Sequence, residues 1–105
     1  MIFLNTPVQA LINPGSTHSF ISYALARYLG LELRELSCPM IVAIPLGKQV
    51  RTYTDYKDGW ILLGNNEFMV ELTSLGIQDF DLILGMDFLS KHNAKIDCQA
   101  KIVDL

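Results

Sequence analysis

The sequence predicts a compact, mainly β domain with two short helices. Short apolar runs recur along the chain, and turns rich in Pro, Gly and Asn separate them. Only two stretches, which begin near Phe20 and Asp87, have a helical pattern. The chain has 105 residues, of which half are hydrophobic and 18% are charged, so it can bury a core of its own. We therefore expect residues 1–105 to form a single domain.

The first third of the chain predicts a hairpin, a loop and a helix. Residues 2–4 and 8–12 are short apolar runs around Asn5-Thr6-Pro7 and form the expected hairpin. A tight loop, Asn13-Pro14-Gly15, follows the second run. The next apolar side chains recur at helical spacing, at Phe20, Ile21, Ala24, Leu25, Tyr28 and Leu29. This expected helix has Ser16 or Thr17 as its cap and ends at Gly30.

Two further hairpins are expected in the middle of the chain. The first joins strands 40–44 and 49–56 through a turn at Pro45-Leu46-Gly47-Lys48. The second joins strands 60–63 and 67–72 through Gly64-Asn65-Asn66. We interpret Lys57-Asp58-Gly59-Trp60, between the two hairpins, as a surface turn.

The last quarter of the chain predicts a buried strand, a short helix and a strand pair. The strand covers residues 81–85 and ends at a glycine, and the helix covers residues 87–92 and stops near Asn93. Residues 94–97 and 101–105 are the expected strand pair around Gln99-Ala100.

Composition and residue spacing argue against several classes of function. The net charge of −3 provides no basic surface for nucleic acid, and no apolar run reaches the roughly 18 residues that span a bilayer. His18 and His92 have no partners at metal-ligand spacing, so we expect no metal and no cofactor. Cys38 and Cys98 are far apart, and two buried free thiols are the simplest interpretation.

Two segments together resemble a known family. Residues 10–22 read Ala-Leu-Ile-Asn-Pro-Gly-Ser-Thr-His-Ser-Phe-Ile-Ser, an apolar strand that enters a tight loop. Residues 79–97 read Asp-Phe-Asp-Leu-Ile-Leu-Gly-Met-Asp-Phe-Leu-Ser-Lys-His-Asn-Ala-Lys-Ile-Asp. With a flap-like hairpin between them, they resemble the retropepsin-like aspartic proteases of plant gypsy-type long-terminal-repeat retrotransposons. The resemblance covers nearly the whole chain.

The resemblance implies a fold, a partner and a substrate. The fold is a closed β-barrel lobe with two short helices and a flap hairpin, and it works as a homodimer. The substrate is a polyprotein peptide, processed in the cytoplasm inside a retroelement particle. Neither nucleic acid nor membrane is an expected partner.

The resemblance also assigns roles to residues of this chain. Asn13 occupies the position of the catalytic Asp, one per subunit, in the active-site loop with Pro14, Gly15, Ser16 and Thr17. The residues expected at the flap and substrate are Ile44, Pro45, Leu46 and Gly47. The expected supporting residues are Leu84, Gly85 and Asp87. Pro14 is a second departure, because many relatives have there a Ser or Thr whose hydroxyl ties the two loops of the dimer together.

Asn13 predicts an aspartic endopeptidase that is inactive as written. Aspartic proteolysis needs two carboxyls that share one proton, and an amide cannot accept the proton of the attacking water. An introduced Asp-to-Asn substitution and a decayed element copy both fit, and the intact remainder of the motif favours the first. Two alternatives stay open: a naturally inactive retropepsin-like binding or dimerisation module, and a structural β domain without a substrate groove.

Overall fold

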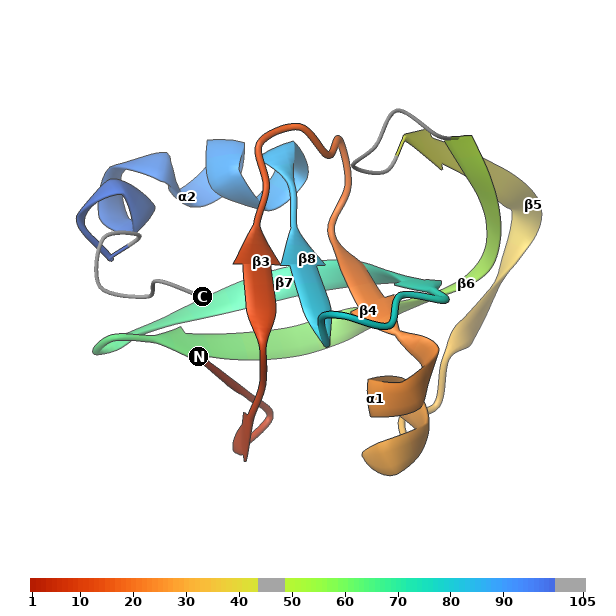
Figure 1. Ribbon diagram of the computed structural model, residues 1–105, viewed down its shortest axis with the longest axis horizontal. Helices are drawn as coiled ribbons and strands as arrows, with labels where there is room; N and C mark the ends of the chain where they lie inside the picture. Colours follow the sequence, from red (N-terminus) through yellow and green to blue (C-terminus); the bar gives the residue numbers. More distant parts are fainter. Residues whose placement is uncertain (44–48, 100–105) are drawn as a thin grey trace.

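The computed structural model describes residues 1–43 and 49–99 and confirms the mainly β fold with two helices (Figure 1). The helices are α1 (Tyr23–Tyr28) and α2 (Met86–Gln99). The eight strands are β1 (Ile2–Phe3), β2 (Thr6–Pro7), β3 (Ala10–Ile12), β4 (Phe20–Ser22), β5 (Arg34–Ala43), β6 (Gln49–Leu63), β7 (Asn66–Leu75) and β8 (Leu82–Leu84).

All eight strands belong to one curled, half-barrel sheet. Its order among the described strands is β2-β1-β6-β7-β4-β8-β3, with β5 paired to β6 outside this path. The long β6–β7 hairpin passes behind the short central strands β3, β8 and β4 in the view of Figure 1. Its turn at Gly64-Asn65 confirms the hairpin that the sequence predicts there.

Strand β8 lies between β3 and β4, and this placement organises both faces of the sheet. β8 pairs parallel with β3 and antiparallel with β4. Successive residues of β8 face opposite sides of the sheet. Leu82 and Leu84 join the larger apolar core, whereas Ile83 joins a second cluster with Phe20, Val42 and Leu75. Fully burying a side chain of this size contributes roughly 1.5–3 kcal/mol, so both faces stabilise the fold.

The predicted N-terminal hairpin is shorter than expected and uses a different second arm. β1 pairs with β2 through a two-residue turn at Leu4-Asn5, both of which have positive φ, as in tight hairpin turns. Residues 8–12 were expected to form the second arm, but β3 pairs with β8 instead. The apolar pattern alone identifies a buried strand without identifying its neighbour.

The predicted helix after the loop is partly wrong. Phe20 and Ile21 share the helical spacing but lie in β4, where they face opposite clusters as strand residues do. The helix begins only at Tyr23, because the Ser22 hydroxyl accepts a hydrogen bond from the Leu25 N–H at 3.0 Å. Neither Ser16 nor Thr17 is its cap. Gly30, with φ of 64°, follows the helix end as expected.

Three other expectations are wrong. Lys57–Trp60 is not a surface turn, because β6 runs through it and Lys57-Asp58 opposes a single residue of β7 in a β-bulge. Residues 94–97 are not a strand, since α2 continues to Gln99 after a kink at His92. Cys38 is exposed rather than buried. The turn 45–48 and the strand 101–105 lie outside the described residues, although β5 and β6 confirm the two arms of the flap hairpin.

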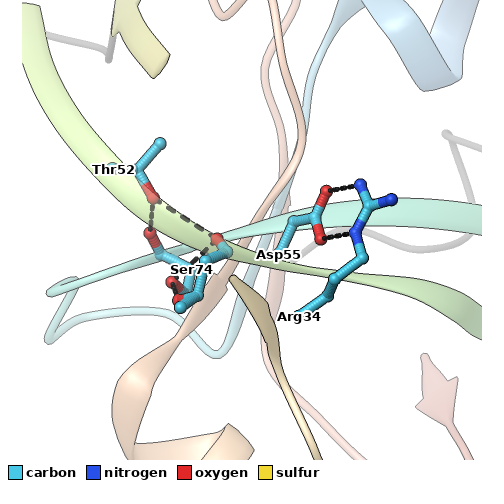
Figure 2. Close-up of polar contacts among 5 residues, drawn as sticks. Arg34, Thr52, Asp55 and Ser74 are labelled. Carbon is cyan, nitrogen blue, oxygen red and sulfur yellow. Dashed lines mark hydrogen bonds and ion pairs between the residues drawn. The ribbon is translucent and has the colours of Figure 1, made fainter. Parts of the chain in front are cut away.

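Polar side chains join β5, β6 and β7 (Figure 2). The Thr52 hydroxyl donates to the Ser74 carbonyl at 2.8 Å, and the hydroxyls of Thr54 and Ser74 hydrogen-bond to each other. Arg34 donates two hydrogen bonds, at 2.9 and 2.7 Å, to the carboxylate of Asp55. That hydrogen bonding raises the pKa of Arg34 above its ordinary value. Since the shift is upward, Arg34 keeps its positive charge until strongly alkaline pH.

The bulge generates a prediction about stability. A Cβ at Gly59 would lie 2.8 Å from Val70 Cγ1 and 2.9 Å from Phe3 Cε1, both inside the main core. We expect Gly59→Ala to lower the free energy of unfolding by about 1–3 kcal/mol because of this overpacking. Urea denaturation of the purified chain measures the change. Gly76→Ala is the matched control, since its Cβ would meet Tyr23 only at 3.6 Å, an ordinary contact. Equal unfolding midpoints for the two variants would contradict the packing argument.

Candidate active site

The candidate site is the loop of residues 13–19, which joins β3 to β4 beside the start of α2 (Figure 1). The Asn13 N–H donates to the Leu84 carbonyl at 2.9 Å and extends the β3–β8 pairing by one residue. The Ser16 N–H then donates to the Asn13 carbonyl at 3.1 Å and closes a turn. Pro14, inside this turn, has no N–H to continue the strand. The loop therefore reverses the chain directly after Asn13.

The side chain of Asn13 is held inside its own loop. The Gly15 N–H donates to Asn13 Oδ1 at 2.7 Å. Of the two ends of the Asn13 amide, only the oxygen accepts a hydrogen bond. The bond from Gly15 therefore also fixes which end of the amide faces the loop. Asn13 is half-buried, whereas Pro14 and Gly15 are exposed. The group at the predicted catalytic position is thus oriented by the backbone and is partly accessible.

The second half of the loop differs in exposure from residue to residue. Ser16 is fully buried, and its hydroxyl has no hydrogen-bond partner among the described residues. Thr17 is exposed, and its hydroxyl lies 2.8 Å from His18 Nδ1. His18 is therefore paired locally with Thr17.

Backbone hydrogen bonds hold the loop against the end of β8. Gly85 allows this close approach because it has no side chain. The Met86 N–H donates to the Ser16 carbonyl at 2.7 Å, and the Asp87 N–H donates to the Thr17 carbonyl at 3.3 Å. A Cβ at Gly85 would overlap the His18 carbonyl oxygen and lie 2.7 Å from that of Ser16. Only glycine permits the two backbones to approach this closely.

Asp87 and Ser19 complete this fastening. The Ser19 hydroxyl donates to Asp87 Oδ1 at 2.7 Å and accepts from the Gly85 N–H at 3.0 Å. The Ser19 N–H donates to Asp87 Oδ2 at 3.3 Å. Asp87 Oδ1 also accepts from the Phe88 N–H at 2.7 Å, in the first turn of α2. Together, Asp87 and Ser19 connect the loop, the residue after β8 and the first turn of α2.

The structure brings together most of the residues that the sequence singles out. Asn13, the loop residues and the junction Leu84–Asp87 form one contiguous unit. Ser19 was missed as a member of this unit. It is a small polar residue directly before a strand, and nothing local distinguishes it from Ser16. The flap residues Ile44, Pro45, Leu46 and Gly47 lie outside the described residues.

The arms of the flap hairpin do reach this region. Val42 of β5 is buried in the second apolar cluster. Val50 of β6 and Leu11 of β3 pack against that cluster. Leu11 and Ile83 belong to the strands that lead into the loop and into Gly85. The hairpin therefore rests on the strand pair that carries Asn13.

No group of three His, Cys, Asp or Glu side chains in the described part of the chain has the geometry of a metal site. No helix within these residues is long and apolar enough to cross a membrane. A hollow of about 190 Å³ lies between β7 and α2, and Glu71, Asp87, Phe88 and Lys91 are among its lining residues.

Comparisons with known proteins agree with this geometry. The family model described as retroviral aspartyl protease matches residues 1–105. Among solved structures, the fold is similar to the retroviral protease-like domain of Ddi1 from Leishmania major, with a TM-score of 0.62 and 21% sequence identity. That similarity covers 85% of this chain and 70% of the Ddi1 domain's chain. A comparison with curated proteins found no match. Since the family model spans every residue, this chain belongs to the retroviral aspartyl protease family.

Proposed function

We propose that this chain is one half of a retropepsin-like aspartic endopeptidase that processes a retroelement polyprotein, and that Asn13 makes the present form inactive. The supporting observation is the position of Asn13. It directly follows β3, its side chain accepts the Gly15 N–H, and its loop packs closely against Gly85. A plant gypsy-type element and a cytoplasmic particle are the setting that its sequence pattern favours.

The proposed site needs two copies of the chain. Aspartic proteolysis uses two carboxyls that hold one water and share one proton, since like charges about 3 Å apart cannot both ionise. The one Asp-Gly of the sequence, Asp58-Gly59, lies within β6 and is not an active-site loop. Two copies related by a two-fold axis would bring residue 13 of each to the same point.

Asn13 removes the chemistry while preserving the geometry. The amide does not ionise near neutral pH and cannot take a proton from water, and a symmetric pair loses both catalytic groups at once. The Gly15 hydrogen bond requires only an acceptor oxygen, which Asp and Asn both supply. The loop conformation is therefore compatible with either residue.

A binding or dimerisation module is the second candidate, and the same hydrogen bond favours it. An amide that fits the loop without strain is also what a naturally inactive member would carry. A purely structural domain agrees less well with Asn13 being partly accessible beside exposed Pro14 and Gly15.

Restoring the carboxylate should restore activity. We expect Asn13→Asp to cleave peptides from its own polyprotein junctions at least about 10²-fold faster than the unmodified chain, the lower range of general acid–base catalysis. The rate should be highest at acidic pH, because one carboxyl of the pair must stay protonated and loses its proton as the pH rises. Peptide hydrolysis followed by mass spectrometry from pH 3 to 8 measures both expectations.

The matched control is Asn65→Asp, which makes the same change of charge in the exposed β6–β7 turn and should stay inactive. A dimeric Asn13→Asp protein that cleaves no peptide across this pH range would count against the endopeptidase and favour the binding module.

The unmodified chain should form a dimer, because neither carboxylate repulsion nor self-digestion opposes pairing in this form. Sedimentation equilibrium from 1 µM to about 500 µM should give a mass that rises toward twice that of the chain. A constant monomer mass at the highest concentration, in a protein whose crystals lack a two-fold contact at residue 13, would overturn the shared site.

Asp87 should act as a positioning residue of the loop. Asp87→Ala leaves Ser19 and the Phe88 N–H without their acceptor, so we expect a loss of about 1–3 kcal/mol in unfolding free energy. In the Asn13→Asp background it should also lower kcat, and Asp87→Asn, which keeps one acceptor oxygen, should recover part of that loss. Asp79→Ala is the control, since it removes an exposed carboxylate. Equal effects at positions 79 and 87 would contradict this role.

A further inference from the structure

A hollow of about 180 Å³ lies beside Trp60, and no residue of the candidate active-site loop is among its lining residues. Ile61 and Phe68, on the paired strands β6 and β7, belong to the main apolar core. Since successive strand residues face opposite sides of a sheet, their neighbours Trp60, Leu62 and Glu67 point outward, away from that core. The hollow is therefore on the outer face of the sheet.

Strand pairing holds the walls of this hollow in place. Ile2 lies opposite Leu62 in the β1–β6 pairing, and Leu62 lies opposite Glu67 in the β6–β7 pairing. The Leu4 N–H donates to the Trp60 carbonyl at 3.2 Å, so the β1–β2 turn is also hydrogen-bonded to β6. The hollow therefore belongs to the folded sheet and needs no partner in order to form.

The lining combines an aromatic ring, apolar side chains and one carboxylate. Trp60 is 45% exposed, although an indole is among the largest apolar groups that a sheet can bury. Ile2, Leu4 and Leu62 supply the apolar wall. Glu67 is exposed, is the one charged side chain among the described residues that line the hollow, and forms no ion pair with any of those residues. The hollow thus has a negative rim that no described cation neutralises.

The geometry points to a docking site for an arginine side chain of a partner protein, with an apolar residue on either side of that arginine. A guanidinium stacks on an aromatic face through cation–π attraction, which is strongest for Trp. Its N–H groups also donate in pairs to a carboxylate, and Glu67 lies diagonally across from Trp60 on the same face. An acidic segment is repelled by Glu67, and a lysine offers only a point charge. This site is separate from proteolysis and does not rest on the proposed endopeptidase.

The single tryptophan of the chain provides the measurement, because fluorescence of Trp60 reports on this hollow alone. The probe is the peptide acetyl-Leu-Arg-Leu-amide, titrated into the unmodified chain up to millimolar concentration at low ionic strength. Two matched peptides replace the arginine by citrulline, which has nearly the same shape without the charge, and by glutamate. Calorimetry gives the dissociation constants of the variants Glu67→Gln and Trp60→Leu. Glu71→Gln is the matched control, because Glu71 lies on the same strand and face but lines the hollow between β7 and α2.

The arginine peptide should change the emission of Trp60 and bind about tenfold more tightly than the citrulline peptide, which lacks both charged contacts. Glu67→Gln should weaken its binding about threefold to fivefold, the factor that an exposed ion pair supplies. Trp60→Leu should weaken it about twofold to fivefold through loss of the cation–π contact. Glu71→Gln should bind as the unmodified chain does, and the glutamate peptide should not bind.

Three results would overturn the docking site. They are equal affinities for the arginine and citrulline peptides, equal losses in Glu67→Gln and Glu71→Gln, and no emission change with any peptide. An emission shift that appears when the chain alone is concentrated, with no further change on adding peptide, would assign the hollow to a second copy and also overturn the arginine site. All titrations use the unmodified loop at Asn13, so their outcome is independent of whether Asn13→Asp cleaves peptides.

Discussion

The close approach of two backbones at Gly85 is the constraint on which the rest of the site depends. The carbonyls of Ser16 and His18 occupy the space that a side chain at Gly85 would need. Ser19 and Asp87 then hydrogen-bond across the same crossing. Because β8 lies between β3 and β4, this one contact fixes the loop against both the sheet and α2. A side chain at Gly85 would therefore displace the loop that carries residue 13, the position on which the proposed chemistry depends.

Shape and chemistry are separable in this domain. The loop conformation depends on backbone donors and on one acceptor oxygen at residue 13, whereas proteolysis depends on whether that oxygen belongs to an ionisable group. The rest of the loop, including Ser16 and the Gly85 junction, is compatible with an active enzyme. The loop conformation is therefore compatible with either Asp or Asn at residue 13, whereas the proposed reaction requires Asp.

The sequence predicts the local elements of this protein better than their neighbours. The β6–β7 hairpin and the buried β8 follow from turn residues and apolar runs, which act within a few positions. The predicted pairing of residues 8–12 with residues 2–4 was wrong, because β3 pairs with a strand about 70 residues further along the chain. The assignment of Phe20 to a helix failed for the same reason, since sheet pairing outweighed the local spacing. At the candidate site, the motif singles out Asn13 and Asp87, whereas Ser19 emerges only from three-dimensional contacts.

The Asn13-Pro14 bond also determines how the protein ages. Asparagine usually becomes aspartate when the backbone nitrogen of the next residue attacks the side-chain amide and forms a cyclic imide. The nitrogen of Pro14 carries no hydrogen, so this route is closed at residue 13. Asn65 and Asn66, at the β6–β7 turn, are followed by residues with a free N–H and keep that route open. Slow chemical damage will therefore alter the turn long before it creates a carboxylate in the loop, and stored protein will not repair its own active site.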